Sequence, residues 1–309
     1  MKKIAFGLIM ASFVYLMGCS NEDKEAYWAE SELCDSKDQC IELAEEYGES
    51  IFDILERSFR YTNQTSFLSV GLETDSFAEE GTFSFDDLVV AKYERDERGF
   101  QFISGNDDPF QDSLIQLMDH LLFDGLVEID KVEFISDGYP ALTLGSKRLL
   151  FPTYFEQFSS ENTLYFILHE LAHAITLDGG LLFDSCDENA SIQDCFEEND
   201  YLDAFNKQFW LDLPDKWFSL SYDSLTYQER YDLYNTRKEE FVSLYSVVAP
   251  LEDIAESLTH FILSPYKADP KTVSEEKINF FYQFDELIEY RTYVLQHLKE
   301  TYEEKASFY

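Results

Sequence analysis

Basic residues are scarce in this chain: 23 Lys and Arg stand against 62 Asp and Glu, and the formal net charge is −39. A protein this acidic repels the phosphates of nucleic acids and anionic lipid headgroups, which excludes charge-driven binding to either. Aromatic residues make up 17% of the 309 residues, so the chain is not a disordered acidic tail. Internal repeats and low-complexity tracts are absent, and the length allows one large core or two lobes.

Long apolar runs are also missing, apart from one at the N-terminus. This run, from Ile4 to Met17, is too short to span a bilayer comfortably. Lys2 and Lys3 precede it, and the sequence Leu16-Met17-Gly18-Cys19 at its end resembles the bacterial lipobox. The pattern predicts a lipoprotein signal peptide; the alternative is an ordinary cleaved signal followed by an incidental cysteine.

On this interpretation Cys19 becomes the lipidated first residue of the mature chain. Ser20, rather than Asp, follows the cysteine, as is typical of lipoproteins sorted to the outer membrane. We therefore expect a signal peptide at 1–18, a short anchored linker at 19–26 and one folded domain at 27–309. The predicted location is the bacterial cell envelope, on the outer membrane.

Cysteines are few, and four follow Cys19. An even number in an exported chain indicates two disulfides, and proximity in the sequence favours Cys34–Cys40 and Cys186–Cys195. A four-cysteine zinc site is the alternative, but the spacings do not suit it and the compartment is oxidising.

Histidine is equally rare, with five residues, yet two of them lie in the sequence His169-Glu170-Leu171-Ala172-His173. Residues four apart lie on one face of a helix, so both imidazoles can bind one metal ion. Glu170 is then placed to act as general base toward a water on that ion. The alternative is a pair of surface histidines on an ordinary helix.

The flanking residues favour a buried helix. Apolar residues recur at intervals of three and four around the motif, and Gly179-Gly180 ends the pattern. Burying two imidazoles costs free energy unless they bind something, and a metal ion satisfies them. The stripe consists of Leu164, Ile167, Leu168, Leu171, Ala174 and Ile175.

Apolar periodicity elsewhere predicts an α+β fold: an N-terminal α+β lobe to about residue 176, with a small sheet upstream of the motif, and a mainly helical lobe from about 177. The segment 177–240 contains acidic residues, a cysteine pair and aromatic residues. We expect the acidic part of this segment to be a solvated, disulfide-closed loop rather than a calcium site. Helices are expected at 39–59, 110–123, 238–263, 273–285 and 286–304, and strands at 66–72, 82–93, 100–103, 132–135 and 141–151.

A catalytic zinc needs a third protein ligand and an open position for water. The best-placed group is Glu252-Asp253-Ile254-Ala255-Glu256, with Tyr245 seven residues before it. A Tyr, six residues and then Glu-x-x-Ala-Glu, downstream of HExxH, resembles the gluzincin metallopeptidases, among them the catalytic domain of anthrax lethal factor and its bacterial relatives.

The resemblance, which covers roughly residues 160–265, implies a zincin-like fold and one Zn²⁺ held by His169, His173 and Glu252. It also implies that Glu170 is the base and that the Tyr245 hydroxyl supports the tetrahedral intermediate. Glu256, on the same face of the helix as Glu252, would orient a histidine ligand. The 78 residues between His173 and Glu252 exceed the family's expected spacing.

Ordinary structural roles compete with these assignments. Glu252 and Glu256 would otherwise form an acidic pair on a solvated helix face, and Tyr245 would serve packing. His260 is expected to be a hydrogen-bonded core residue rather than a ligand.

The sequence as a whole predicts a membrane-anchored zinc metallopeptidase acting on a peptide or protein substrate. The alternatives are a catalytically silent envelope binding protein on a peptidase fold and a zinc hydrolase with a non-protein envelope substrate. An intact Glu170 speaks against the silent protein, since an inactive relative does not need its base.

Overall fold

The computed structural model describes residues 27–29, 31–56, 85–106, 108–136, 142–144, 147–153, 155, 160–177, 200–214, 217 and 225–306. The expected signal peptide, the lipidated Cys19, the linker, the Cys186–Cys195 pair and the strand at 66–72 lie outside these residues. Within them, no helix combines the length and apolarity needed to cross a bilayer.

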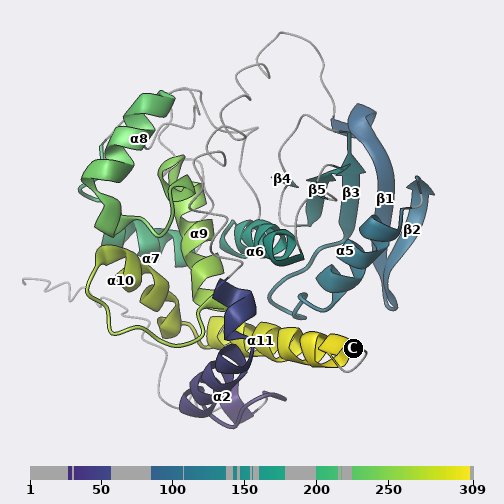
Figure 1. Cartoon of the computed structure of the whole chain (residues 1–309), viewed down its shortest axis with the longest axis horizontal. Helices are drawn as coiled ribbons and strands as arrows, with labels where there is room; N and C mark the ends of the chain where they lie inside the picture. Colours follow the sequence, from purple (N-terminus) through teal and green to yellow (C-terminus); the bar gives the residue numbers. More distant parts are fainter. Residues whose placement is uncertain are drawn as a thin grey trace, which may run out of the picture.

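The architecture is α+β, as predicted, with the sheet on one side of the helix α6 and most of the C-terminal helices on the other (Figure 1). The five strands run in the spatial order β2-β1-β3-β5-β4. Their bounds are β1 Val89–Asp96, β2 Gly99–Gly105, β3 Lys131–Ile135, β4 Leu142–Leu144 and β5 Arg148–Pro152.

Among the interior strands β1, β3 and β5, the neighbours β3 and β5 run parallel. Four of the five residues in each are buried, as expected for strands covered on both faces. All other neighbours are antiparallel, and the strand order places β2 and β4 at the two edges.

Two strand predictions were wrong in detail. The expected strand at 141–151 is two antiparallel strands, β4 and β5; Gly145 and Ser146 lie between them in the sequence and interrupt its apolar pattern. The expected strand at 82–93 begins only at Val89, after a 3₁₀ turn at Phe85–Leu88 whose two aspartates disfavour a strand.

The helices of the described chain match the expected periodicity more closely. The motif helix is α6, Ser160–Thr176, and it ends before Gly179. The stretch from Lys238 is not one helix: two 3₁₀ turns, Lys238–Glu240 and Tyr245–Val247, precede α9, which starts at Pro250 because proline suits a first helical position. The other helices are α2 Lys37–Ser50, α5 Pro109–Asp119, α7 Asp200–Phe209, α8 Tyr227–Thr236, α9 Pro250–Leu263, α10 Val273–Phe280 and α11 Asp285–Ala306.

Segment 177–240 is not only a solvated loop. Its described part includes α7 and α8, and three of its aromatic residues are fully buried. Trp210 and Trp217 lie edge to face, and the Trp217 indole donates to the carbonyl of Val247, next to the start of α9. These aromatic side chains therefore form part of the core around α9: Phe205, Trp210 and Trp217.

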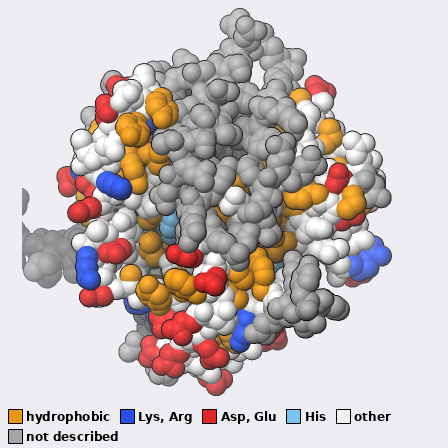
Figure 2. All heavy atoms as spheres, in the orientation of Figure 1, with side chains coloured by type: hydrophobic (Ala, Val, Ile, Leu, Met, Phe, Trp, Pro, Cys, Tyr) orange, Lys and Arg blue, Asp and Glu red, His pale blue; other side chains and the backbone are white. Residues whose placement is uncertain are grey.

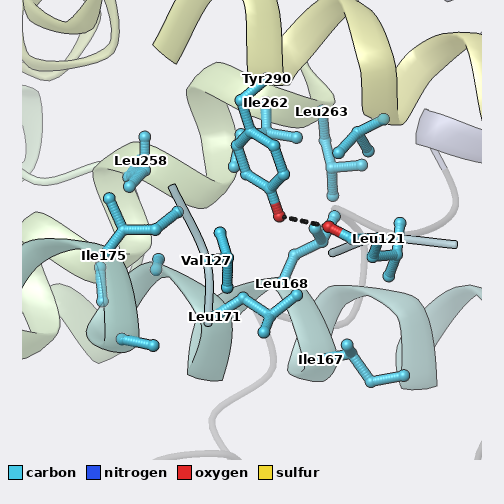
Figure 3. Close-up of a cluster of buried hydrophobic side chains, with 14 of the residues drawn as sticks. Leu121, Val127, Ile167, Leu168, Leu171, Ile175, Leu258, Ile262, Leu263 and Tyr290 are labelled. Atoms are coloured by element: carbon cyan, nitrogen blue, oxygen red, sulfur yellow. Dashed lines mark hydrogen bonds between the residues drawn. The ribbon is translucent and has the colours of Figure 1, made fainter. Parts of the chain in front are cut away.

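α6 is the centre of the molecule. Its apolar side chains meet residues from α9 and α11 in one cluster (Figure 3), which includes Leu168, Leu171, Leu258 and Tyr290. Tyr290 satisfies its buried hydroxyl by donating to the carbonyl of Leu121. Because α6 is enclosed on so many sides, its polar residues have a fixed environment.

The N-terminal segment is fastened to the last helix. The predicted Cys34–Cys40 disulfide is present at the start of α2, which packs along α11. Thr292 on α11 donates to the carbonyl of Cys40, and Tyr27 donates to the carboxylate of Glu289. Acidic side chains gather on the surface in the region of α2 (Figure 2). On α2 itself, Glu42, Glu46 and Glu49 are exposed.

Candidate metal centre

Three polar residues of the HExxH motif are buried within α6. His169, Glu170 and His173 are 5%, 6% and 9% exposed, values usual for core residues. The alternative of two surface histidines on an ordinary helix is therefore excluded. Helical geometry places the two imidazole rings on one side of α6, where their centroids lie 4.7 Å apart.

Glu252 reaches the same place from the first turn of α9. Ala249 is the N-cap and Pro250 starts the helix, so Glu252 lies among the free N–H groups at the N-terminus, where a carboxylate is favoured. The helices α6 and α9 pack directly against each other. Glu252 is 5% exposed, which rules out the alternative of an acidic pair on a solvated face.

The side-chain ends of His169, His173 and Glu252 meet at one point. Oε2 of Glu252 lies 3.0 Å from Nε2 of His169 and 3.3 Å from Nε2 of His173, and the two Nε2 atoms are 3.1 Å apart. One ligand atom from each residue lies within 4.8 Å of the others, a spacing that can hold a metal ion. Two imidazoles and one carboxylate, all buried, are a typical catalytic-zinc donor set.

Without a metal, these three groups stabilise one another by charge. Burial opposes ionisation of Glu252, but the adjacent His173 and His169 outweigh it and hold the pKa of that carboxyl well below its usual range. Burial likewise disfavours the imidazolium of His169, yet Glu252 and Glu256 raise its pKa well above the ordinary value. The site thus attracts one positive charge, which a proton or a cation can supply.

Glu256 occupies the predicted position behind His169. Its Oε1 lies 2.8 Å from Nδ1 of His169, in an oblique rather than linear contact. The hydroxyls of Tyr165, at 2.8 Å, and Ser243 donate to the other oxygen. Burial acts to raise the pKa of Glu256, but His169, His260 and Ser243 together lower it, so the carboxylate stays charged and holds the imidazole.

Tyr245 lies beside the cluster, at the start of a 3₁₀ turn. Its ring packs edge to face against His169, with centroids 5.7 Å apart, and is partly buried. The structure therefore places Tyr245 next to His169, one of the three candidate metal ligands, where both a packing and a catalytic role are compatible with its position.

His260 is held away from the cluster, in agreement with the prediction of a hydrogen-bonded core residue. Its Nδ1–H donates to the carbonyl of Glu256 at 2.8 Å, and its ring lies edge to face against Tyr165. Burial lowers its pKa despite the carboxylate of Glu256.

Ser243 and Tyr165 were not predicted from the sequence, although both contact Glu256. Tyr165 is four residues before His169, and that spacing on α6 could have pointed to it. Ser243 lies thirteen residues before Glu256, outside any helical spacing, and only the fold reveals it.

No protein-family model, curated protein or solved structure matches the chain, so the interpretation of this centre rests on its own geometry.

Proposed function

We propose that the protein is a zinc-dependent metallopeptidase. The observation that carries this proposal is the convergence of His169, His173 and Glu252 on one point, with Glu170 adjacent in the motif. The donor chemistry supports zinc, since imidazole nitrogen and carboxylate oxygen are its usual catalytic ligands. A zincin-like arrangement, in which the motif helix lies between a sheet and a helical lobe, is part of the same proposal.

Zinc at this position would bring the pKa of a bound water down to about 7 and polarise a substrate carbonyl. Glu170 accepts the proton of the attacking water on its carboxylate and then delivers it to the leaving nitrogen. Glu256 fixes the ring of His169, so that Nδ1 keeps its proton and Nε2 faces the cluster.

Tyr245 is assigned to the oxyanion. Its ring packs against His169, which brings the residue close to where the scissile carbonyl would bind. In the proposed reaction the phenol O–H donates a hydrogen bond to the carbonyl oxygen as negative charge develops on it. Attachment to the outer membrane through Cys19 remains part of the proposal and rests on the lipobox alone.

The test compares four variants for bound zinc and for cleavage of a mixed peptide library, with and without a chelator. Glu170→Gln should keep zinc and lower turnover about 10²–10⁴-fold or more, because only the base is lost. Glu252→Ala should lose zinc, whereas Glu256→Ala should weaken zinc by about 10–100-fold. Tyr245→Phe should keep zinc and KM and lower kcat about 10²–10³-fold.

The outcomes separate this proposal from its rivals. A wild-type protein that holds less than a tenth of an equivalent of zinc after reconstitution would refute the metallopeptidase. Zinc without peptide cleavage would instead favour a silent binding protein or a hydrolase of another substrate. Loss of zinc in Glu256→Ala but not in Glu252→Ala would exchange the roles of the two glutamates.

A further inference from the structure

Ser243 is a buried serine whose hydroxyl has an unusual set of partners. The residue is 0% exposed, and its Oγ–H donates to the Glu256 carboxylate. The same Oγ accepts from two backbone N–H groups, those of Tyr245 and Ser246, each at 3.1 Å. One side-chain oxygen therefore binds both the partner of His169 and the turn that carries Tyr245.

The turn depends on this oxygen for its local structure. The 3₁₀ turn Tyr245–Val247 has no side-chain cap at its N-cap residue, Leu244. Its first two N–H groups would have no acceptor in the turn itself, and Ser243 supplies one. Unmet backbone donors in a buried position cost free energy, so this contact fixes where the Tyr245 backbone lies.

We infer that Ser243 is a positioning residue that couples Tyr245 to the metal ligand His169 through Glu256. This inference rests on the proposed function. One arm of the coupling runs from Ser243 to Glu256 and on to the ring of His169. The other runs from Ser243 to the backbone of Tyr245. The Oγ atom of Ser243 therefore fixes the position of Tyr245 relative to Glu256 and His169.

The chain offers a matched control in Ser257. It is also a serine with 0% exposure, it adjoins Glu256 on α9, and its hydroxyl has no hydrogen-bond partner. Ser257→Ala deletes the same kind of atom from a second fully buried position without breaking either arm. Tyr165→Phe provides a second comparison, because it removes the other hydroxyl donated to Glu256 and leaves the turn untouched.

The first measurement is amide hydrogen exchange on metal-free protein, which is independent of catalysis. Ser243→Ala should speed exchange at Tyr245 and Ser246 by about 5-fold, because both amides lose their acceptor. Amides of the central strands β3 and β5 should be unchanged. Ser257→Ala and Tyr165→Phe should leave both groups of amides as in the wild type.

The second measurement is zinc affinity and steady-state kinetics. Ser243→Ala should weaken zinc about 10-fold and, at saturating zinc, lower kcat about 10-fold with little change in KM. In a Glu256→Gln background its effect on zinc affinity should shrink below about 2-fold, since that arm is already cut. In a Tyr245→Phe background its effect on kcat should shrink likewise.

Several results would overturn the coupling: Ser243→Ala indistinguishable from Ser257→Ala, effects that simply add in the double variants, or fast exchange throughout β3 and β5. The last would make Ser243 a general structural residue. A wild-type protein that binds no zinc contradicts the proposed function instead, whereas a zinc-binding wild type insensitive to Ser243→Ala contradicts only the coupling.

Discussion

His169 is the residue in which the electrostatics of the centre are concentrated. Two carboxylates, Glu252 at 3.0 Å from Nε2 and Glu256 at 2.8 Å from Nδ1, enclose its ring. Together they outweigh burial and raise its pKa well above the ordinary value. In the metal-free protein these contacts therefore favour the imidazolium form of His169, whose added proton takes the place of the positive charge of a metal ion.

Zinc and this proton should compete. Binding at pH 7 should release about one proton from His169, and zinc affinity should rise with pH until the raised pKa is passed. The proton on His169 also contributes to the free energy of unfolding of the metal-free protein. This contribution is fully present below the unfolded pKa of about 6.5 and is lost as the pH rises through the raised pKa of the folded protein. Calorimetry in buffers of different ionisation enthalpy measures the proton count, and a count of zero would contradict the charged His169.

The sequence predicted the residues of this centre unevenly. His169, Glu170 and His173 follow from their spacing, because helical geometry alone relates them. Glu252 was predicted only through a family resemblance, since nothing in the 78 intervening residues indicates that α9 returns to α6. Ser243 could not be predicted: a serine becomes informative only when the fold brings a carboxylate to it.

At the level of elements, α9 is held at its start by a buried ion pair. Asp253, the neighbour of Glu252, lies 2.7 Å from Nζ of Lys277 on α10, and the two side chains are 0% and 1% exposed. The indole of Trp210, just after α7, donates to the same oxygen at 2.9 Å. Burial raises the pKa of Asp253 even with these partners, so the pair matters for its charge.

Removing one partner of the Asp253–Lys277 pair should destabilise the protein. Lys277→Met leaves a buried carboxylate without its cation and should lower the free energy of unfolding by about 3–5 kcal/mol, measured by urea denaturation. Asp253→Asn combined with Lys277→Met should lose less than the two single variants together. The control is Lys207→Met, whose partner Asp203 is exposed, and it should show no change beyond error. If Lys277→Met and Lys207→Met lowered the free energy of unfolding equally, the buried Asp253–Lys277 pair would not be what stabilises the start of α9.

Periodicity predicted elements well where one face alone is apolar. It failed at β4 and β5, where one strand was expected across Gly145 and Ser146, and at 238–249, where short 3₁₀ turns carry no period of their own. α7 was missed because the acidic residues before it dominate the local composition, although its aromatic residues are buried. Tertiary burial, which a local pattern does not encode, decided the case of α7.

For the whole molecule, the candidate centre joins two parts of the chain. His169 and His173 belong to α6, beside the sheet, and Glu252 belongs to α9, on the other side of α6. A ligand that requires all three residues binds only the folded protein, so it must stabilise the entire fold. The N-terminal segment, fastened to α11 by Thr292, adds a second long-range link.

Zinc at 100 times its dissociation constant should therefore add about 2.7 kcal/mol to the free energy of unfolding. For a domain of this size the melting temperature should rise by roughly 4–5 °C, measured by scanning calorimetry with zinc and with a chelator. Glu170→Gln should show the full shift, because the base is not a ligand, and Glu252→Ala should show none. The acidic surface makes this comparison decisive: with 62 Asp and Glu residues, loosely bound zinc would stabilise Glu252→Ala as much as the wild type. Equal shifts in those two proteins would place the metal outside the centre of His169, His173 and Glu252.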